Sequence, residues 1–160
     1  MHWTVVATPV GDLSIAADGA AICRIHFGPC PGSPVRRDDS LLTAAATQLA
    51  EYFAGRRTEF ELPLASVGGS EFDRAVWAHL ATIPYGEMRT YGEVAAAVGD
   101  RSAARAVGVA CNRNRLPVLL PCHRVVGAGG KLVGFGGGLP RKRLLLELEA
   151  RVRVESDFGL

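Results

Sequence analysis

The sequence predicts two domains: an α/β N-terminal domain with a small sheet and one helix, and a mostly helical C-terminal domain with a helix-turn-helix motif. Short runs of β-branched and aromatic residues fill much of the first 27 positions, as in strands. After residue 40, apolar residues recur at helical spacing. A glycine-containing segment at residues 66–69 separates the two patterns and predicts a linker. We therefore place the domains at residues 1–66 and 67–160.

The N-terminal domain is expected to hold three strands and one helix before the linker. The predicted strands are residues 3–6, 13–16 and 21–27. A helix is predicted at residues 41–53, because apolar side chains recur there on one face. Residues 60–62 predict a further short strand, and residues 28–34, with three prolines and two glycines, predict an irregular loop.

Each of the three helices predicted at the start of the C-terminal domain begins at a polar capping residue. Ser70 with Asp73, and Thr90 with Glu93, have the spacing of a capping box. Ser102 is predicted to cap the third helix, which runs through residue 109. The second and third helices, joined by a short turn that contains a glycine, form a helix-turn-helix pattern. An ordinary helical hairpin fits that pattern equally well.

Cys122, which is followed at once by His123, is the first candidate for chemistry. A thiolate is the strongest nucleophile that a side chain offers near neutral pH, and a neighbouring base or positive charge makes it available. Cysteine is also among the residues most often buried, so the alternative is a structural cysteine in the core. The pair alone does not decide between the two interpretations.

Basic residues surround this pair in the sequence. Between residues 101 and 143 there are nine Lys and Arg residues and no Asp or Glu. They are Arg101, Arg105, Arg113, Arg115, Arg124, Lys131, Arg141, Lys142 and Arg143. The positive electrostatic field of these side chains would stabilise a thiolate and attract a polyanion. The alternative interpretation is a basic face that is simply solvated. Residues 70–160 carry thirteen basic and nine acidic side chains, a net charge of +4. Residues 1–69 carry five basic and seven acidic side chains, a net charge of −2. A polyanionic partner would therefore bind the C-terminal domain.

Several motifs in about the last ninety residues occur in the order and at the spacing of one known family. They are Ile83-Pro84-Tyr85-Gly86, Tyr91-Gly92-Glu93-Val94, Ala104-Arg105-Ala106-Val107-Gly108, Asn114, Pro121-Cys122-His123-Arg124-Val125 and Gly134-Phe135-Gly136-Gly137-Gly138. With these motifs the chain resembles the O6-alkylguanine-DNA alkyltransferases, also called methylated-DNA–protein-cysteine methyltransferases. The resemblance implies a small α/β supporting domain followed by a domain with a winged helix-turn-helix DNA-binding motif.

The resemblance implies direct repair of DNA. The alkyl group of O6-alkylguanine in duplex DNA would pass irreversibly to Cys122 after the damaged nucleotide has been flipped out of the helix. The product is a thioether, which has no carbonyl for water to attack, so each protein would act once and inactivate itself. The resemblance leaves open whether O4-alkylthymine is also a substrate. We expect no cofactor, because no methyl donor is needed.

The resemblance also implies roles for residues around Cys122. His123 matches the family's base, which acts on the thiol through a water, and Glu149 matches the acid that orients this histidine. From the residues alone, Glu149 is an ordinary polar position of a helix and is easily confused with Glu147. Asn114 matches an asparagine that ties down the turn carrying the active-site residues.

Other matched residues are expected to contact DNA or the damaged base. Arg105 matches the arginine that fills the space left by the flipped nucleotide, and Tyr91 matches a tyrosine near that nucleotide's phosphate and base. Without the resemblance, a phosphate-contacting arginine and a core tyrosine are the simpler interpretations. The expected DNA-binding residues are Tyr91, Ser102, Ala103, Arg105, Ala106, Arg113 and Arg115. The expected alkylguanine pocket consists of Tyr91, Val125, Phe135 and Gly136, with residues 134–138 closing over the base.

Two positions depart from the family pattern. Arg115 stands where a proline commonly follows the asparagine, and Cys111 stands where an asparagine is common. Arg115 could add a phosphate contact. Cys111 is close enough in sequence to Cys122 to compete with it for alkylation or oxidation.

The four cysteines are few and irregularly spaced, so they predict neither a disulfide framework nor a metal site. Cys23, His26 and Cys30, with His2 farther away, are conceivable zinc ligands. Their spacing is a weak signal, however, and we expect no metal.

Two other classes of protein stay open. A pure DNA-binding module lacks a reactive cysteine, which Cys122 argues against. A Cys-His hydrolase would act through a thioester and release product repeatedly.

The 160 residues, 48% of them hydrophobic, include no transmembrane-length span and no signal-peptide pattern. We therefore expect a cytoplasmic protein that is a monomer in solution; the number of copies that assemble on DNA stays open.

Overall fold

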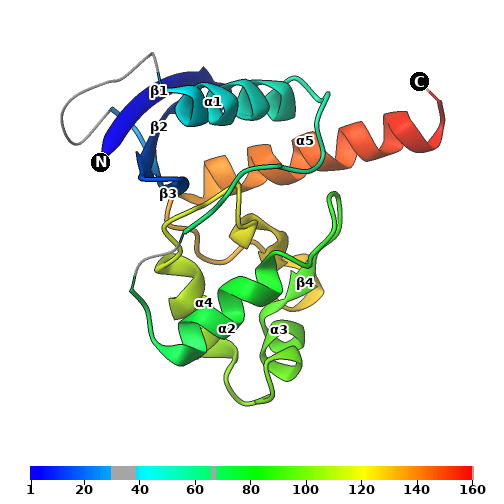
Figure 1. The fold of residues 1–160 in the computed structure, drawn as a ribbon. Coiled ribbons are helices and arrows are strands. Elements are labelled where there is room, and N and C mark those ends of the chain that lie inside the picture. The colour runs from blue at the N-terminus through cyan, green and yellow to red at the C-terminus, as the bar shows by residue number, and fades with distance from the viewer. Residues whose placement is uncertain (30–38, 66–67, 160) are drawn as a thin grey trace. The chain divides into compact units, whose positions relative to one another are not determined.

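The computed structural model describes residues 1–29, 39–65 and 68–159. The chain divides into two compact units, residues 1–67 and 68–160. An α/β unit comes first and a mostly helical unit follows, which confirms the predicted fold class (Figure 1). None of the helices in the described ranges is both long enough and apolar enough to cross a membrane.

The first unit is a three-stranded antiparallel sheet with one helix packed against it (Figure 1). Its elements are β1 (His2–Thr8), β2 (Gly11–Asp18), β3 (Ala21–Phe27) and α1 (Ser40–Phe53), and the strand order is β1-β2-β3. The Asp39 carboxylate caps α1 by accepting hydrogen bonds from the backbone N–H groups of Leu41 and Leu42. The helix then buries Leu42 and Leu49 in the core of the unit. The three predicted strands and the predicted helix are therefore confirmed.

The prediction of a strand at residues 60–62 is wrong. The side-chain amide of Gln48 replaces a partner strand, because its Oε1 accepts from the Glu61 N–H (2.9 Å) and its Nε2 donates to the Glu61 carbonyl (3.2 Å). Farther along, Leu64 forms an isolated parallel bridge with Ile22 of β3. The predicted loop at residues 28–34 lies mostly outside the described residues, as does Cys30.

The second unit consists of helices and one short two-stranded sheet (Figure 1). Its helices are α2 (Glu71–Leu80), α3 (Tyr91–Ala97), α4 (Ala104–Asn112) and α5 (Leu139–Asp157). Its strands are β4 (Arg89–Thr90) and β5 (Val125–Val126), which pair in parallel, and its 3₁₀ turns are η1 (Cys122–Arg124) and η2 (Ala128–Gly130). A glycine-rich loop, residues 127–138, joins β5 to α5.

Local capping begins two of these helices as predicted. Ser70 and Asp73 form a complete capping box at α2, and Thr90 and Glu93 form another at α3. The prediction for the third helix is wrong: Ser102 does not cap α4. Its hydroxyl and its backbone N–H both bond to the Asp100 carboxylate, at 2.6 and 3.0 Å, and α4 begins without a side-chain cap.

Helix α4 packs against both α2 and α3, which makes α3 and α4 the predicted helix-turn-helix. The indole N–H of Trp77, on α2, donates to the Ala110 carbonyl of α4 (2.8 Å). Because α4 buries Val107 and Ala110 against its neighbours, its opposite face is left accessible. That face carries Arg105, Ala106, Val109 and Asn112, all of them exposed.

Candidate active site

Cys122 begins the 3₁₀ turn η1 at the end of a tightly held loop, residues 114–121. The Asn114 side chain closes this loop, since its Nδ2 donates to the Leu120 carbonyl (2.9 Å) and its Oδ1 accepts from the Leu116 N–H (2.9 Å). Between these anchors Val118 has a φ of 73°, which costs a β-branched residue about 1–3 kcal/mol. The surrounding bonds therefore hold a strained backbone just before the cysteine.

The Cys122 thiol is buried, with 5% of the residue exposed. Burial raises the pKa of the thiol, and the hydrogen bond from Asn114 and the positive charge of Lys142 offset this only in part. Of the basic stretch, Lys142 favours the thiolate as expected, but burial outweighs this effect in the resting protein. Cys122 rests as a thiol that must give up its proton to a base.

His123 is fully buried beside Glu149 of helix α5. Its Nε2 lies 2.7 Å from Glu149 Oε2. Burial lowers the pKa of His123, although the Glu149 carboxylate acts in the opposite direction, so the imidazole is neutral near pH 7. A neutral ring bonded to a carboxylate must donate through Nε2–H, which leaves the lone pair on Nδ1. No described residue forms a hydrogen bond with that buried Nδ1 atom.

Glu149 also binds Arg124, which sequence reasoning did not assign to the site. Arg124 Nε donates to Oε1 (2.8 Å) and Nη2 donates to Oε2 (2.9 Å), and the Gly86 N–H adds a bond to Oε1 (3.1 Å). Burial by itself would raise the pKa of Glu149, but its bonds to His123 and Arg124 and their charges lower it well below the usual range. Glu147, the alternative in the sequence, is exposed.

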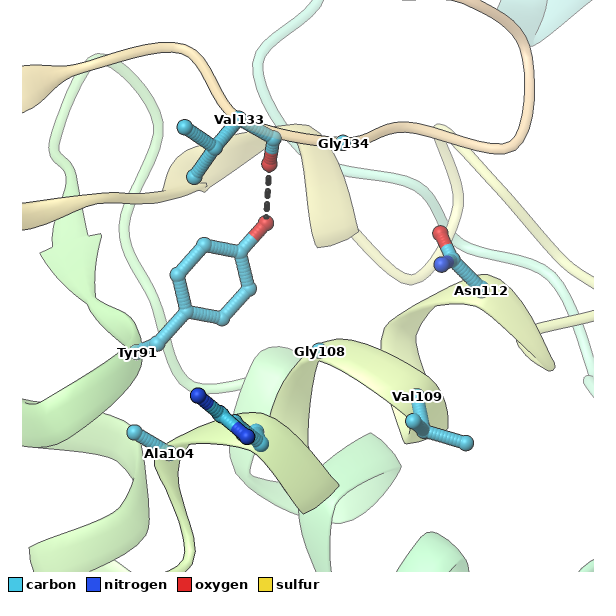
Figure 2. A pocket seen from close by; sticks show the side chains of 8 residues that line it. Tyr91, Ala104, Gly108, Val109, Asn112, Val133 and Gly134 are labelled. Carbon is cyan, nitrogen blue, oxygen red and sulfur yellow. Dashed lines mark hydrogen bonds between the residues drawn. The ribbon is translucent and has the colours of Figure 1, made fainter.

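A second residue that sequence reasoning did not assign, Lys142 of α5, is buried behind the glycine-rich loop. Its Nζ donates to the Gly134 carbonyl (3.1 Å) and to the Tyr91 hydroxyl (3.3 Å). The Tyr91 hydroxyl in turn donates to the Val133 carbonyl (2.8 Å; Figure 2). Tyr91 and Lys142 thus fasten the loop to the helical part of the unit. In the sequence, Lys142 was visible only as one of several basic residues in a basic stretch, so nothing there indicated this role.

A pocket of about 420 Å³ opens between this loop and helix α4 (Figure 2). Helix α4 supplies one wall, and Tyr91, Val133 and Gly134 supply the other. The wall residues from α4 are Ala104, Arg105, Gly108, Val109 and Asn112. Burial raises the pKa of Tyr91 to about 12, and smaller contributions come from the negative charge that Cys111 and Cys122 can carry. Both thiols are therefore close enough to Tyr91 to act on its hydroxyl electrostatically, although neither lines the pocket.

The other expected pocket residues lie nearby without lining this opening. Val125 is buried in β5, while Phe135 and Gly136 follow Gly134 in the loop. Cys111 is buried at the end of α4, and burial raises its pKa to about 12, so it rests as a thiol.

The expected DNA-binding residues lie at or near α4. Arg105 and Arg115 are exposed, and neither forms a hydrogen bond with another described residue. Arg113 bonds to Asp73 (3.3 Å) with most of its side chain exposed. Ser102, Ala103 and Ala106 lie at the accessible start of the helix.

The candidate zinc ligands do not form a site in the part of the chain that the structure describes. No group of three or more His, Cys, Asp or Glu residues gathers there in a way that could hold a metal ion. Cys23 belongs to the core of the first unit, where it packs with Trp3 and Ala16.

Two family models match nearly the whole chain. The model of the 6-O-methylguanine DNA methyltransferase ribonuclease-like domain matches residues 1–66, and the model of the DNA binding domain of the same enzymes matches residues 71–151. The chain belongs to the 6-O-methylguanine DNA methyltransferase family.

Relatives in this family match the chain over most or all of its length. The methylated-DNA–protein-cysteine methyltransferase of Mycobacterium bovis is 43% identical over 100% of this chain and 98% of its own length. The enzyme of the same name from Methanosarcina acetivorans is 41% identical over 93% of this chain and 98% of its own length. The crystal structure of Mycobacterium tuberculosis OGT in complex with DNA superimposes with a TM-score of 0.84 at 42% identity, covering 95% of this chain and 94% of that one.

Proposed function

We propose that this methylated-DNA–protein-cysteine methyltransferase moves the alkyl group of O6-alkylguanine in duplex DNA onto its own Cys122. One observation carries the proposal. A buried thiol is followed in the chain by a neutral, buried imidazole, and that imidazole is bonded to a charged carboxylate. Nucleophilic catalysis of this kind uses a nucleophile, a base that takes its proton and a third group that orients the base.

His123 is the proposed base. Its Nε2–H is held by Glu149, so the buried Nδ1 lone pair is the atom that can receive the proton of the Cys122 thiol, through a water between them. Glu149 orients the ring and stabilises the positive charge that forms on it. Asn114 positions the thiol by bonding to it and by closing the preceding loop.

The transfer is a displacement at the alkyl carbon. The sulfur forms a bond to that carbon as the bond from carbon to O6 breaks, and the electron pair of that bond stays with the guanine. The proton from the thiol passes to His123, and the guanine anion that leaves takes up one proton, from His123 or through solvent, so that neutral guanine is restored. Water cannot cleave the resulting thioether as it would cleave a thioester, so one protein repairs one lesion.

To reach O6 inside a duplex, the protein must extrude the nucleotide. The exposed Arg105, at the mouth of the pocket, is the residue proposed to fill the gap, and Tyr91 is proposed to contact the extruded nucleotide. We assign the backbone near Val125 and Gly136, with Phe135, to contacts with the base. Ser102, Ala103, Ala106, Arg113 and Arg115 form the proposed DNA-binding surface around α4.

We further propose that the first unit supports the second, and that the reaction takes place in the cytoplasm, where a free thiol stays reduced. The active form proposed is a monomer in solution. No cofactor takes part in the proposed transfer, because the DNA itself supplies the alkyl group.

Intact-protein mass spectrometry with peptide mapping tests the proposal. The protein is incubated with duplex DNA that contains one O6-methylguanine, and a gain of one methyl group on Cys122, saturating at one per protein, is expected. Cys122→Ser should bind the duplex without gaining the group, and mapping distinguishes Cys111. Binding without any methyl gain, or repeated turnover, would contradict the proposal. A parallel duplex with O4-methylthymine tests that second substrate.

A further inference from the structure

Cys111 is a second buried thiol in the same unit as Cys122, and the proposed transfer does not use it. It lies in the last turn of α4, with 9% of the residue exposed. It follows Gly108 by three residues and so lies on the same side of that helix. A Cβ atom at Gly108 would lie 3.8 Å from the ring of Tyr91 (Figure 2). Cys111 therefore lies on the side of α4 that is turned toward Tyr91.

Asn114 contacts both cysteines. Its backbone N–H donates to the Cys111 carbonyl (3.2 Å), and its side chain forms a hydrogen bond with the Cys122 thiol. The same side chain donates to the carbonyl of Leu120, two residues before Cys122 (2.9 Å). Because an asparagine is short, these bonds bring the end of α4 close to the turn that carries Cys122.

The buried ammonium group of Lys142 acts on both thiols. Its Nζ is fixed by bonds to the Gly134 carbonyl (3.1 Å) and the Tyr91 hydroxyl (3.3 Å). Burial lowers the pKa of Lys142, whereas negative charge on Cys122 or Cys111 raises it. Burial raises the pKa of Cys111 to about 12, charge on Cys122 adds to this effect, and Lys142 opposes it. One cation thus favours a thiolate on either sulfur, and the two sulfurs are close enough to act on each other electrostatically.

We propose that Cys111 and Cys122 form a redox modification site that reacts with a hydroperoxide and closes as a reversible disulfide. This rests on the proposed function in one respect, that Cys122 is the nucleophile. In the first step the Cys122 sulfur attacks one oxygen of the peroxide, and the O–O bond breaks with its electron pair on the other oxygen. The thiol proton joins that oxygen to give water or an alcohol, and Cys122 becomes a sulfenic acid.

In the second step the Cys111 sulfur attacks the Cys122 sulfur. The S–S bond forms as the S–O bond breaks, and the hydroxide that leaves takes the Cys111 proton as water. Overall, two thiols lose two electrons and two protons, and one peroxide is reduced. The disulfide keeps Cys122 from reacting with DNA, and it also prevents further oxidation to the sulfinic acid, which dithiols do not reverse. Reduction by a dithiol returns both thiols.

Peptide mapping of the peroxide-treated wild-type protein tests this proposal. Trypsin cleaves after arginine, so Cys111 falls in the peptide of residues 106–113 and Cys122 in that of residues 116–124. The reduced, DNA-free protein is treated with hydrogen peroxide and digested without a reductant. We expect these two peptides to be linked, with the loss of two hydrogen atoms. Treated protein should gain no methyl group from damaged DNA until dithiothreitol restores the gain to at least about 80% of the untreated value.

Cys111→Ser removes the second thiol and keeps the first. Without peroxide it should gain the methyl group as the wild-type protein does. After peroxide, dithiothreitol should restore at least about fivefold less methyl gain than in the wild-type protein, and Cys122 should carry two added oxygen atoms. Cys23→Ser is the matched control, because Cys23 is also buried but packs with Trp3 and Ala16 in the first unit. It should behave as the wild-type protein throughout.

Absence of the linked peptides would overturn the proposal, and so would a link from Cys122 to Cys23 or Cys30. Equal recovery of the wild-type protein and Cys111→Ser would also overturn it. The mapping uses the wild-type protein, so it decides the question even if Cys111→Ser does not fold. Failure of the proposed function is separate, since it appears as no methyl gain on Cys122 before any peroxide is added.

Discussion

The buried carboxylate of Glu149 compensates the positive charge of Arg124 and bonds to His123. Each of its oxygens accepts a bond from Arg124, one accepts from His123 and the other from the Gly86 N–H. A buried carboxylate is stable in its charged form only with such partners. Because Arg124 supplies the compensating charge, His123 can stay neutral and keep the lone pair that a base needs.

Glu149→Gln should destabilise the protein by about 3–5 kcal/mol, because it leaves the buried Arg124 charge without a counterion. Urea unfolding measures this loss, and the rate of transfer to Cys122 should fall as well. Glu147→Gln, an equal change at an exposed position two residues away, should change the unfolding free energy by about 0.5 kcal/mol or less. Equal effects of the two substitutions would contradict the assigned role of Glu149.

His123 should make stability depend on pH. Its pKa in the folded protein is lower than the ordinary value of 6.5, so the unfolded chain binds a proton first as pH falls. The stability that neutral His123 contributes is therefore complete above pH 6.5 and is lost as pH falls below it, through the lowered pKa. Urea unfolding at pH 7.5, 6.5 and 5.5 should show a smaller loss for His123→Asn than for the wild-type protein. Parallel losses would argue against a buried neutral histidine.

Residues next to each other in the chain were predictable, whereas the partners that complete the site were less so. Cys122 and His123 are adjacent, so their side chains suggested a nucleophile beside a base, although the resemblance was needed to prefer that interpretation over a structural cysteine. Glu149 could be chosen over Glu147 only by resemblance, because both lie on one helix. Arg124 and Lys142 were not predicted as site residues, since a charged side chain is expected at the surface unless a partner distant in sequence, such as Glu149, compensates for its burial.

At the scale of elements, α3 depends on its first turn. The helix has only seven residues, too few to be stable by itself in water, so its capping box matters. Thr90→Ala removes the oxygen that accepts from the Glu93 N–H and should cost about 1 kcal/mol in urea unfolding. Ser102→Ala, before α4, should cost less than half as much, because that hydroxyl caps no helix. A larger loss at Ser102 would contradict the cap assignment.

The contrast between local and distant hydrogen-bond partners explains which elements the sequence could predict. Capping boxes at Ser70 and Thr90 are local, with both partners within three residues, so these helix starts were found. Ser102 was misassigned because Asp100, two residues earlier, takes its hydroxyl. The strand at residues 60–62 was misassigned because the amide of Gln48, on α1, takes the backbone bonds of Glu61 that a neighbouring strand would have taken.

On the scale of the whole molecule, the basic stretch serves two different purposes. Arg124 and Lys142 are buried and hold internal groups, so their charges stabilise the site rather than meet a polyanion. The exposed members, Arg101, Arg105, Arg113, Arg115, Lys131 and Arg143, are the ones available for the proposed phosphate contacts. A net charge of +2 therefore understates how basic the surface of the second unit is.

Binding to DNA should consequently weaken with salt, and Arg115 should account for a defined part of that dependence. Each phosphate contact adds about 0.9 to the slope of log affinity against log salt concentration. Arg115→Ala should lower this slope by about 1 in fluorescence titrations, while the transfer rate at saturating DNA stays unchanged. Arg56→Ala removes the same charge from an exposed position in the first unit and should leave the slope unaltered. If the two variants gave the same slope, net charge rather than a contact at Arg115 would govern binding.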